Sequence, residues 1–154
     1  MKEETICTEA QMMIRKPVAE VFNAFIDPAI TTKFWFTSSS GKLEEDKSVT
    51  WEWKMYNASA VVHVLRIIQN EKIVFKWNSP ARMVEFTFTS IGDDKTYVVA
   101  KESGYSETGN DLIRIIKDST GGFTTVLDGL KAYLEHNISL NLIGDKFPPE
   151  LTKH

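Results

Sequence analysis

Cysteine is almost missing from this sequence: Cys7 is the only one among 154 residues, so an internal disulfide is impossible. The first residues are not followed by an apolar signal segment, and no apolar run is long enough to cross a bilayer. These absences predict a cytoplasmic protein and argue against a disulfide-stabilised secreted domain or a membrane protein.

An excess of basic residues is missing as well. The sequence has 18 Lys and Arg against 21 Asp and Glu, a formal net charge of -3, and the two signs are interspersed. Such a surface has no positive field to attract phosphate backbones, so nucleic acid is not expected as a partner.

Motifs for common chemistry are absent too. There is no glycine-rich phosphate loop, no paired cysteine or histidine spacing for a metal, and no Gly-x-Ser-x-Gly elbow, so no metal or cofactor is expected. Three histidines remain. His63 lies in a predicted strand and is either a general base in a pocket or a histidine facing solvent or satisfied in the core; His136 lies near a predicted helix end, where it suits the helix dipole, and His154 is terminal.

What the sequence does contain is enough apolar material for one core. With 42% hydrophobic residues, a chain of this length buries roughly two-thirds of its unfolded surface. Residues 1–154 are therefore predicted to form a single domain.

Strands are predicted wherever apolar and polar residues alternate. Trp51, Trp53 and Met55 share one face of a predicted strand, and short turns between the strands favour an antiparallel meander. The expected inward residues of two later strands are Ile73, Phe75, Trp77, Val84, Phe86 and Phe88. The predicted strands cover 5–14, 49–56, 60–68, 73–77, 83–91 and 96–103.

Helical spacing predicts helices near both ends of the sequence. One begins at Pro17 and stops at Asp27, and a shorter one over 28–34 delivers Trp35 and Phe36. A short helix is expected over 111–117, and a long final one from a cap at 119–120 to about Asn137. Gly121-Gly122 then falls in its first turn, which suggests a close backbone approach or a hinge, and the tail 141–154 is expected to be extended. The final helix has one apolar face of Phe123, Leu127, Leu130 and Leu134.

This order of elements predicts an α+β fold in which a curved antiparallel sheet wraps around the long C-terminal helix. A pocket between sheet and helix is a natural consequence. Aromatic residues either line that pocket or fill the core, and the pattern leaves both open. Glu102 and Arg66 point either into the cavity or, at strand ends, into water. The ligand-binding candidates are Trp35, Phe36, Trp51, Trp53, Trp77, Phe86, Phe88, Glu102, Phe123, Leu127 and Leu130.

Several segments, in this order and spacing, resemble the SRPBCC (START-like) superfamily: Ile14 to Phe22, Asp27-Pro28, Trp35-Phe36, Gly122-Phe123, and 130–135. More narrowly, the sequence resembles the branch named for the activator of the heat-shock chaperone's ATPase, whose members usually carry Trp where Phe123 stands. The resemblance implies a helix-grip fold like that of the birch-pollen allergen, with about seven strands and two short helices after the first strand. The extra N-terminal domain of the eukaryotic co-chaperone has no counterpart in this sequence, which argues against chaperone stimulation.

Three hypotheses about function follow. The first is a non-enzymatic carrier or sensor that binds a small hydrophobic or aromatic molecule in the cavity. The second is a protein-interaction module, with a chaperone as a possible partner, as the family name suggests. The third, an enzyme of the cyclase or hydrolase type, requires a polar group in the cavity and is the least favoured.

Overall fold

The computed structural model describes residues 6–78 and 80–151, and within them seven strands form one antiparallel sheet. The spatial order is β1-β7-β6-β5-β4-β3-β2, so only β1 is placed out of sequence, beside the last strand. Every other neighbouring pair is consecutive in the chain, as the short predicted turns require. The strands are β1 (Cys7–Ile14), β2 (Ser38–Ser39), β3 (Ser48–Trp53), β4 (Ala58–Ile68), β5 (Lys72–Trp77), β6 (Arg82–Gly92) and β7 (Lys95–Ser103).

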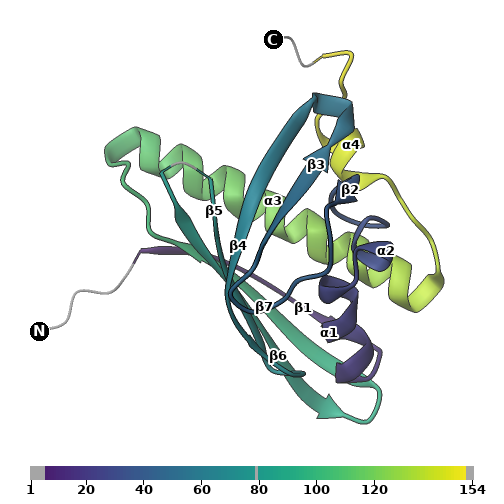
Figure 1. The fold of residues 1–154 in the computed structure, drawn as a ribbon. Coiled ribbons are helices and arrows are strands. Elements are labelled where there is room, and N and C mark those ends of the chain that lie inside the picture. Colours follow the sequence, from purple (N-terminus) through teal and green to yellow (C-terminus); the bar gives the residue numbers. More distant parts are fainter. Residues whose placement is uncertain (1–5, 79, 152–154) are drawn as a thin grey trace, which may run out of the picture.

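The helices cover one side of this sheet (Figure 1). The longest, α3 (Gly109–His136), runs across the sheet, and α1 (Val18–Ile26) and α2 (Pro28–Thr31) cover one end of it. The short α4 (Leu142–Lys146) lies close to the tip of the β3–β4 hairpin, where η1 (Lys54–Tyr56) forms a single 3-10 turn. This is the helix-grip arrangement of START-like proteins. No helix in the described part of the chain is long and apolar enough to cross a membrane.

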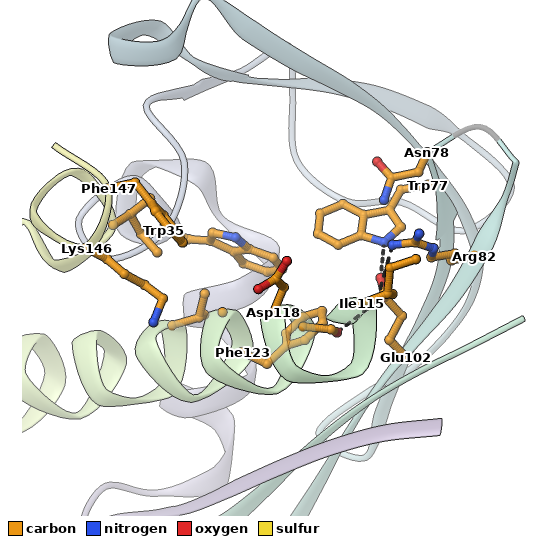
Figure 2. A pocket seen from close by; sticks show the side chains of 14 residues that line it. Trp35, Trp77, Asn78, Arg82, Glu102, Ile115, Asp118, Phe123, Lys146 and Phe147 are labelled. Atoms are coloured by element: carbon orange, nitrogen blue, oxygen red, sulfur yellow. Dashed lines mark hydrogen bonds and ion pairs between the residues drawn. The ribbon is translucent and has the colours of Figure 1, made fainter. Parts of the chain in front are cut away.

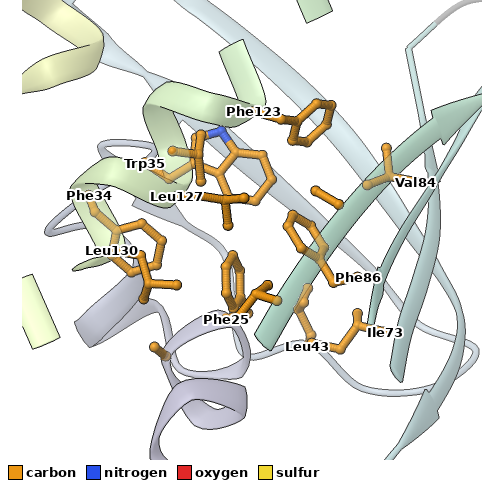
Figure 3. Close-up of a cluster of buried hydrophobic side chains, with 14 of the residues drawn as sticks. Phe25, Phe34, Trp35, Leu43, Ile73, Val84, Phe86, Phe123, Leu127 and Leu130 are labelled. Carbon is orange, nitrogen blue, oxygen red and sulfur yellow. The ribbon is translucent and has the colours of Figure 1, made fainter. Parts of the chain in front are cut away.

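The core lies between the sheet and the helices (Figure 3). The expected inward parity of two strands is confirmed, because Ile73, Phe75, Val84, Phe86 and Phe88 are all buried and Trp77 packs partly buried against the same core. The predicted face of the long helix is confirmed as well. Its residues Phe123, Leu127 and Leu130 are buried, and Leu134 packs partly buried against the same core.

Polar contacts fasten α3 to the first strand. The Lys131 ammonium donates to the Met13 carbonyl at 2.8 Å and to Glu135 Oε2 at 2.7 Å, and the same oxygen accepts the Arg15 N–H at 2.9 Å. Burial by itself would raise the pKa of Glu135, but these hydrogen bonds and the Lys131 charge outweigh it and lower that pKa. The helix is therefore held against the sheet by an ionised carboxylate.

Several predicted boundaries are wrong. The strand expected to reach Tyr56 ends at Trp53, because Asn57 adopts a left-handed conformation that closes the η1 turn, and Met55 is consequently exposed. A two-residue strand, β2, lies in a polar stretch where no strand was predicted, because its backbone pairs with Glu52 and Trp51. Of the first predicted strand, Thr5 lies outside the described residues.

The C-terminal half differs more. The two helices expected over 111–137 are one continuous helix, and the tail expected to be extended contains α4. Ser119 does not cap a helix, because its hydroxyl donates to Glu102, and Thr120 hydrogen bonds to the carbonyl of Ile116 one turn earlier. Gly121-Gly122 therefore lies in the middle of α3 rather than in a first turn.

Candidate functional site: a cavity beside the long helix

A cavity of about 350 Å³ lies between α3, the ends of β5 and β6, and α4, and it is open to solvent (Figure 2). This volume lies within the range of small-molecule sites. Three aromatic rings form much of its wall: Trp35, Trp77 and Phe123, whose ring centroids are 6.0 to 6.1 Å apart. Aliphatic side chains complete the apolar lining, namely Ile115, Val126 and Ile143.

Local structure explains how Trp35 reaches the cavity. Asp27 caps α2 by accepting the Ala29 N–H at 3.0 Å, and Pro28 begins the helix. The Thr31 hydroxyl then donates to the Ala24 carbonyl at 2.6 Å, which fastens α2 to α1. Trp35 comes four residues after the end of this short helix, its N–H donates to the Thr31 carbonyl at 2.9 Å, and it is only 6% exposed. Its position is therefore fixed by backbone and side-chain hydrogen bonds before any ligand is present.

A buried carboxylate forms the polar end of the cavity. Glu102, at the end of β7, is 2% exposed. Its Oε2 accepts the Trp77 indole N–H at 2.7 Å, and its Oε1 accepts the Ser119 hydroxyl at 2.8 Å (Figure 2). The Tyr105 hydroxyl lies 3.2 Å from Oε1, and Arg82 Nη1 lies 4.0 Å from it. The Ser119 and Tyr105 hydroxyls and the Arg82 charge therefore gather at Oε1, while Oε2 accepts from Trp77.

The groups around Glu102 are themselves held in place. Arg82 Nη2 lies 3.4 Å from Glu107 Oε2, and its guanidinium lies 5.4 Å from the centre of the Tyr105 ring. The Tyr105 hydroxyl is also 2.6 Å from Thr8 Oγ1. Burial raises the pKa of Tyr105, and the nearby Glu102 charge contributes to the rise, so the phenol stays protonated at neutral pH. The polar end is thus rigid and internally paired.

The opposite wall is contributed by α4. The Tyr56 hydroxyl lies 3.0 Å from the Ile143 carbonyl oxygen and 2.6 Å from that of Phe147, so one side chain of the β3–β4 tip holds both ends of this wall. Burial raises the pKa of Tyr56, and the charge of Asp145 adds to it. At neutral pH the phenol is therefore protonated, and its single hydrogen is shared between these two carbonyls, with the shorter contact to Phe147.

Two charges lie at the mouth of the cavity. Lys146 and Asp118 both line it and both are exposed, and neither has an ion-pair partner among residues 6–78 and 80–151. The Lys146 ammonium lies 5.6 Å from the centre of the Phe147 ring. The mouth is therefore polar while the interior is apolar, as is usual for small-molecule sites.

The structure places the predicted site residues in three groups. Trp35, Trp77, Glu102 and Phe123 line the main cavity. Phe36 lines, together with Trp35, a second hollow of about 180 Å³ next to the 139–143 segment. The others belong to the packed interior: Trp51, Phe86, Phe88, Leu127 and Leu130 are buried in the core, and Trp53 is half-buried against it.

Other candidates lie away from the cavity. Arg66 is exposed, so of its two expected positions, in the cavity or in water at a strand end, the second is the observed one. His63 is exposed and lies 2.9 Å, through Nδ1, from the Ser48 hydroxyl, and His136 is exposed in the last turn of α3. Within the described ranges, no group of three or more His, Cys, Asp or Glu side chains could hold a metal ion.

Sequence reasoning missed several lining residues. The α4 wall was missed because the tail carries no helical apolar pattern, only Leu142 and Ile143 before Gly144. Arg82 was missed because it is the first residue of its strand. It pairs in register with Trp77, which was predicted to line the cavity. The position opposite Trp77 in the hairpin could therefore have been identified from the sequence. Glu102 was ambiguous because β7 is apolar on both faces. The other missed lining residues are Asn78, Ile115, Asp118, Ser119, Gly122, Val126, Lys146 and Phe147.

Comparisons with known proteins show the family and the fold of the chain. The model of the family described as Activator of Hsp90 ATPase homolog 1-like protein matches residues 15–135, and the chain belongs to that family. No curated protein matches the chain.

Among solved structures, protein SSP2350 from Staphylococcus saprophyticus is 27% identical, with a TM-score of 0.78 over 88% of this chain and 96% of that one. An HSP90 activator from Plasmodium falciparum, PFC0360w, is 18% identical, with a TM-score of 0.65 over 84% and 96%. A START superfamily protein from Mycobacterium smegmatis is 10% identical, with a TM-score of 0.64 over 83% and 98%. These likenesses place the fold in the START-like group.

Proposed function

We propose that the protein binds a small hydrophobic or aromatic molecule in the cavity beside α3 and acts as a non-enzymatic carrier or sensor in the cytoplasm. The observation that carries this proposal is the open cavity of about 350 Å³ whose walls are Trp35, Trp77 and Phe123. Aromatic rings offer large contact areas with little loss of side-chain entropy, so they suit a flat apolar ligand.

The state of the buried acid favours binding over catalysis. A general acid or base must exchange a proton with the substrate, but Glu102 is already surrounded by Trp77, Ser119, Tyr105 and Arg82. The carboxylate is only 2% exposed and already accepts from Trp77 and Ser119, so it offers little access to a reacting group. Its role in this proposal is to keep the polar end of the cavity rigid.

A second candidate function is a protein-interaction module of the chaperone-activator type. Two observations favour it: the family description, and a group of exposed apolar side chains in the C-terminal segment. These side chains are Ile138, Leu140, Phe147 and Leu151, which are 49%, 47%, 56% and 80% exposed. Binding of a chaperone by this segment does not require the cavity to hold a ligand, so the two functions separate experimentally.

A fluorescence titration tests the first proposal. 2-Naphthol, a neutral bicyclic probe, is expected to quench tryptophan emission saturably, because Trp35 and Trp77 line the cavity. At a hundred times the dissociation constant, bound probe should stabilise the fold by about 2.7 kcal/mol in a thermal melt.

The matched control is Trp53→Phe, which removes a tryptophan outside the cavity and should leave the saturable quench in place. If neither 2-naphthol nor a broad panel of neutral aromatic and aliphatic compounds changes the emission or the melting temperature, the carrier proposal fails. If the same protein, which binds no ligand, still captures a chaperone in a pull-down, the result supports the interaction module.

A further inference from the structure

One glycine in α3 has no packing reason to be a glycine. Gly122 lies in the middle of a 28-residue helix with helical backbone angles, where glycine is destabilising relative to alanine. A Cβ built there meets no atom of the described chain within 4 Å, leaving aside its own helix backbone and chain neighbours. The helix therefore has a residue of low helix propensity at a point where a side chain would fit.

The other three glycines of this helix have visible reasons, beginning with Gly109, its first residue, whose left-handed φ of 58° favours glycine. At Gly129 a Cβ would come within 3.1 Å of Phe34 Cβ and 3.3 Å of the Phe34 carbonyl oxygen, so close packing of α3 on the α2 region requires glycine. At Gly121 a Cβ would lie 3.3 Å from the Lys146 ammonium, the movable end of a flexible side chain. Gly122 stands apart from Gly121 and Gly129, because the space beside it is open.

That open space is on the cavity side of the helix. Ile115, Ser119, Gly122 and Val126 all line the cavity, and their spacing of four, three and four residues places them on one face of α3. A side chain at Gly122 would therefore project from the centre of that face into the cavity. Figure 2 shows the α3 ribbon passing directly beneath the cavity, with Trp77 on the opposite side.

We infer that Gly122 is the specificity-determining residue of this cavity: by omitting a side chain, it lets a flat, multi-ring ligand lie directly against the backbone of α3. This inference rests on the proposed function, since it names what limits the size of the ligand at the same site. The neighbouring aromatic walls of Trp35, Trp77 and Phe123 fit the same ligand class, because flat rings stack or meet edge to face with them.

The test compares Gly122→Ala with Gly121→Ala as its matched control. Both changes raise helix propensity, so both variants should fold and melt at or above the wild-type temperature. Only Gly122→Ala places a methyl group in the cavity. We expect its affinity for 2-naphthol to fall by about tenfold, the discrimination that one methyl group gives in a tight apolar pocket. Binding of phenol, a single ring, should fall less, and Gly121→Ala, whose methyl group would meet only the movable end of Lys146 at the mouth, should bind both probes nearly like the wild type.

The outcomes separate the two levels of inference. If the wild type binds neither these probes nor any compound of the broad panel, the proposed function fails and the role of Gly122 fails with it. If the wild type and Gly122→Ala bind 2-naphthol equally, the carrier proposal stands and only the inference about Gly122 is overturned. A Gly122→Ala variant that melts well below the wild type also overturns it, because the glycine would then be required by the fold.

Discussion

Replacing Glu102 by Gln tests whether this carboxylate is part of the structure or a reactive group. The exchange keeps the shape of the side chain but removes its charge and turns one acceptor into a donor. If the amide oxygen keeps its bond to the Trp77 N–H, the amide NH2 takes the place of Oε1, next to Arg82 and the Ser119 and Tyr105 hydroxyls. The NH2 group then faces one cation and two donors.

The cost follows from these contacts. A buried hydrogen bond to a charged group contributes about 1.5–3 kcal/mol, and the two hydroxyls recover part of the loss by turning to accept from the amide. Arg82 keeps a second carboxylate, Glu107, so it is not left without a counter-charge. We therefore expect Glu102→Gln to lower the free energy of unfolding by about 2–4 kcal/mol. Ser119→Ala removes a single bond to the same oxygen and gains helix propensity, so it should cost about 1–2.5 kcal/mol.

Denaturant titration followed by tryptophan fluorescence measures these losses, and Trp77 reports the local change directly because its indole N–H contacts the mutated side chain. The matched control is Glu107→Gln, since Glu107 also pairs with Arg82 but its side chain is 25% exposed; its loss should be about 1 kcal/mol at most. A loss below about 0.5 kcal/mol for Glu102→Gln would refute the reasoning. A gain in stability would indicate that the carboxylate is held at an energetic cost, as reactive groups often are.

Three further predictions concern stability and the cavity wall. Leu127→Ala should cost about 2–5 kcal/mol in a denaturant titration, because Leu127 is fully buried; a loss below half of the lower figure would contradict its packing. The pKa of Glu135 is lowered in the folded protein, so the ionised carboxylate stabilises the fold above the ordinary glutamate pKa, and this stability is lost as pH falls through the folded-state pKa. Glu135→Gln should therefore make the free energy of unfolding fall less steeply at acid pH. An unchanged pH dependence would contradict this. Tyr56→Phe should release the α4 wall and speed both association and dissociation of 2-naphthol in stopped-flow fluorescence, and unchanged rates would show that α4 is held by other contacts.

Much of the fold was predictable because its signals are local. Alternation with a period of two placed Phe75 and Phe86 inside, and spacing close to 3.6 residues placed Leu127 and Leu130 on the buried face of a helix. Short turn segments between alternating runs favour antiparallel neighbours, and the observed strand order follows the chain for all strands but β1. Periodicity and turn length act within a few residues, so they are readable without knowledge of the partner surface.

The helix over 109–136 shows where such local signals mislead. The run from Ser119 to Thr125 consists mostly of weak helix formers, and Ser and Thr often mark helix starts, so two helices were predicted. In the folded chain, the Ser119 hydroxyl donates to Glu102. The hydroxyls of Thr120, Thr124 and Thr125 donate to backbone carbonyls one turn earlier in the same helix. Burial of Phe123 and its neighbours against the sheet offsets the poor propensity, which is a tertiary effect.

The sequence by itself determined the fold class, the order of the strands from β3 to β7 and the apolar face of the long helix, because these depend on periodicities and turn lengths that each segment carries alone. Only the tertiary structure decided which aromatic residues line a cavity and which fill the core, since Trp77 and Trp51 have the same local pattern but different partners across the sheet. It also decided that Glu102 points inward and that Gly122 faces open space. Each of these depends on groups brought together from β5, β7, α3 and α4, whose distances from one another are set only when the chain has closed on itself.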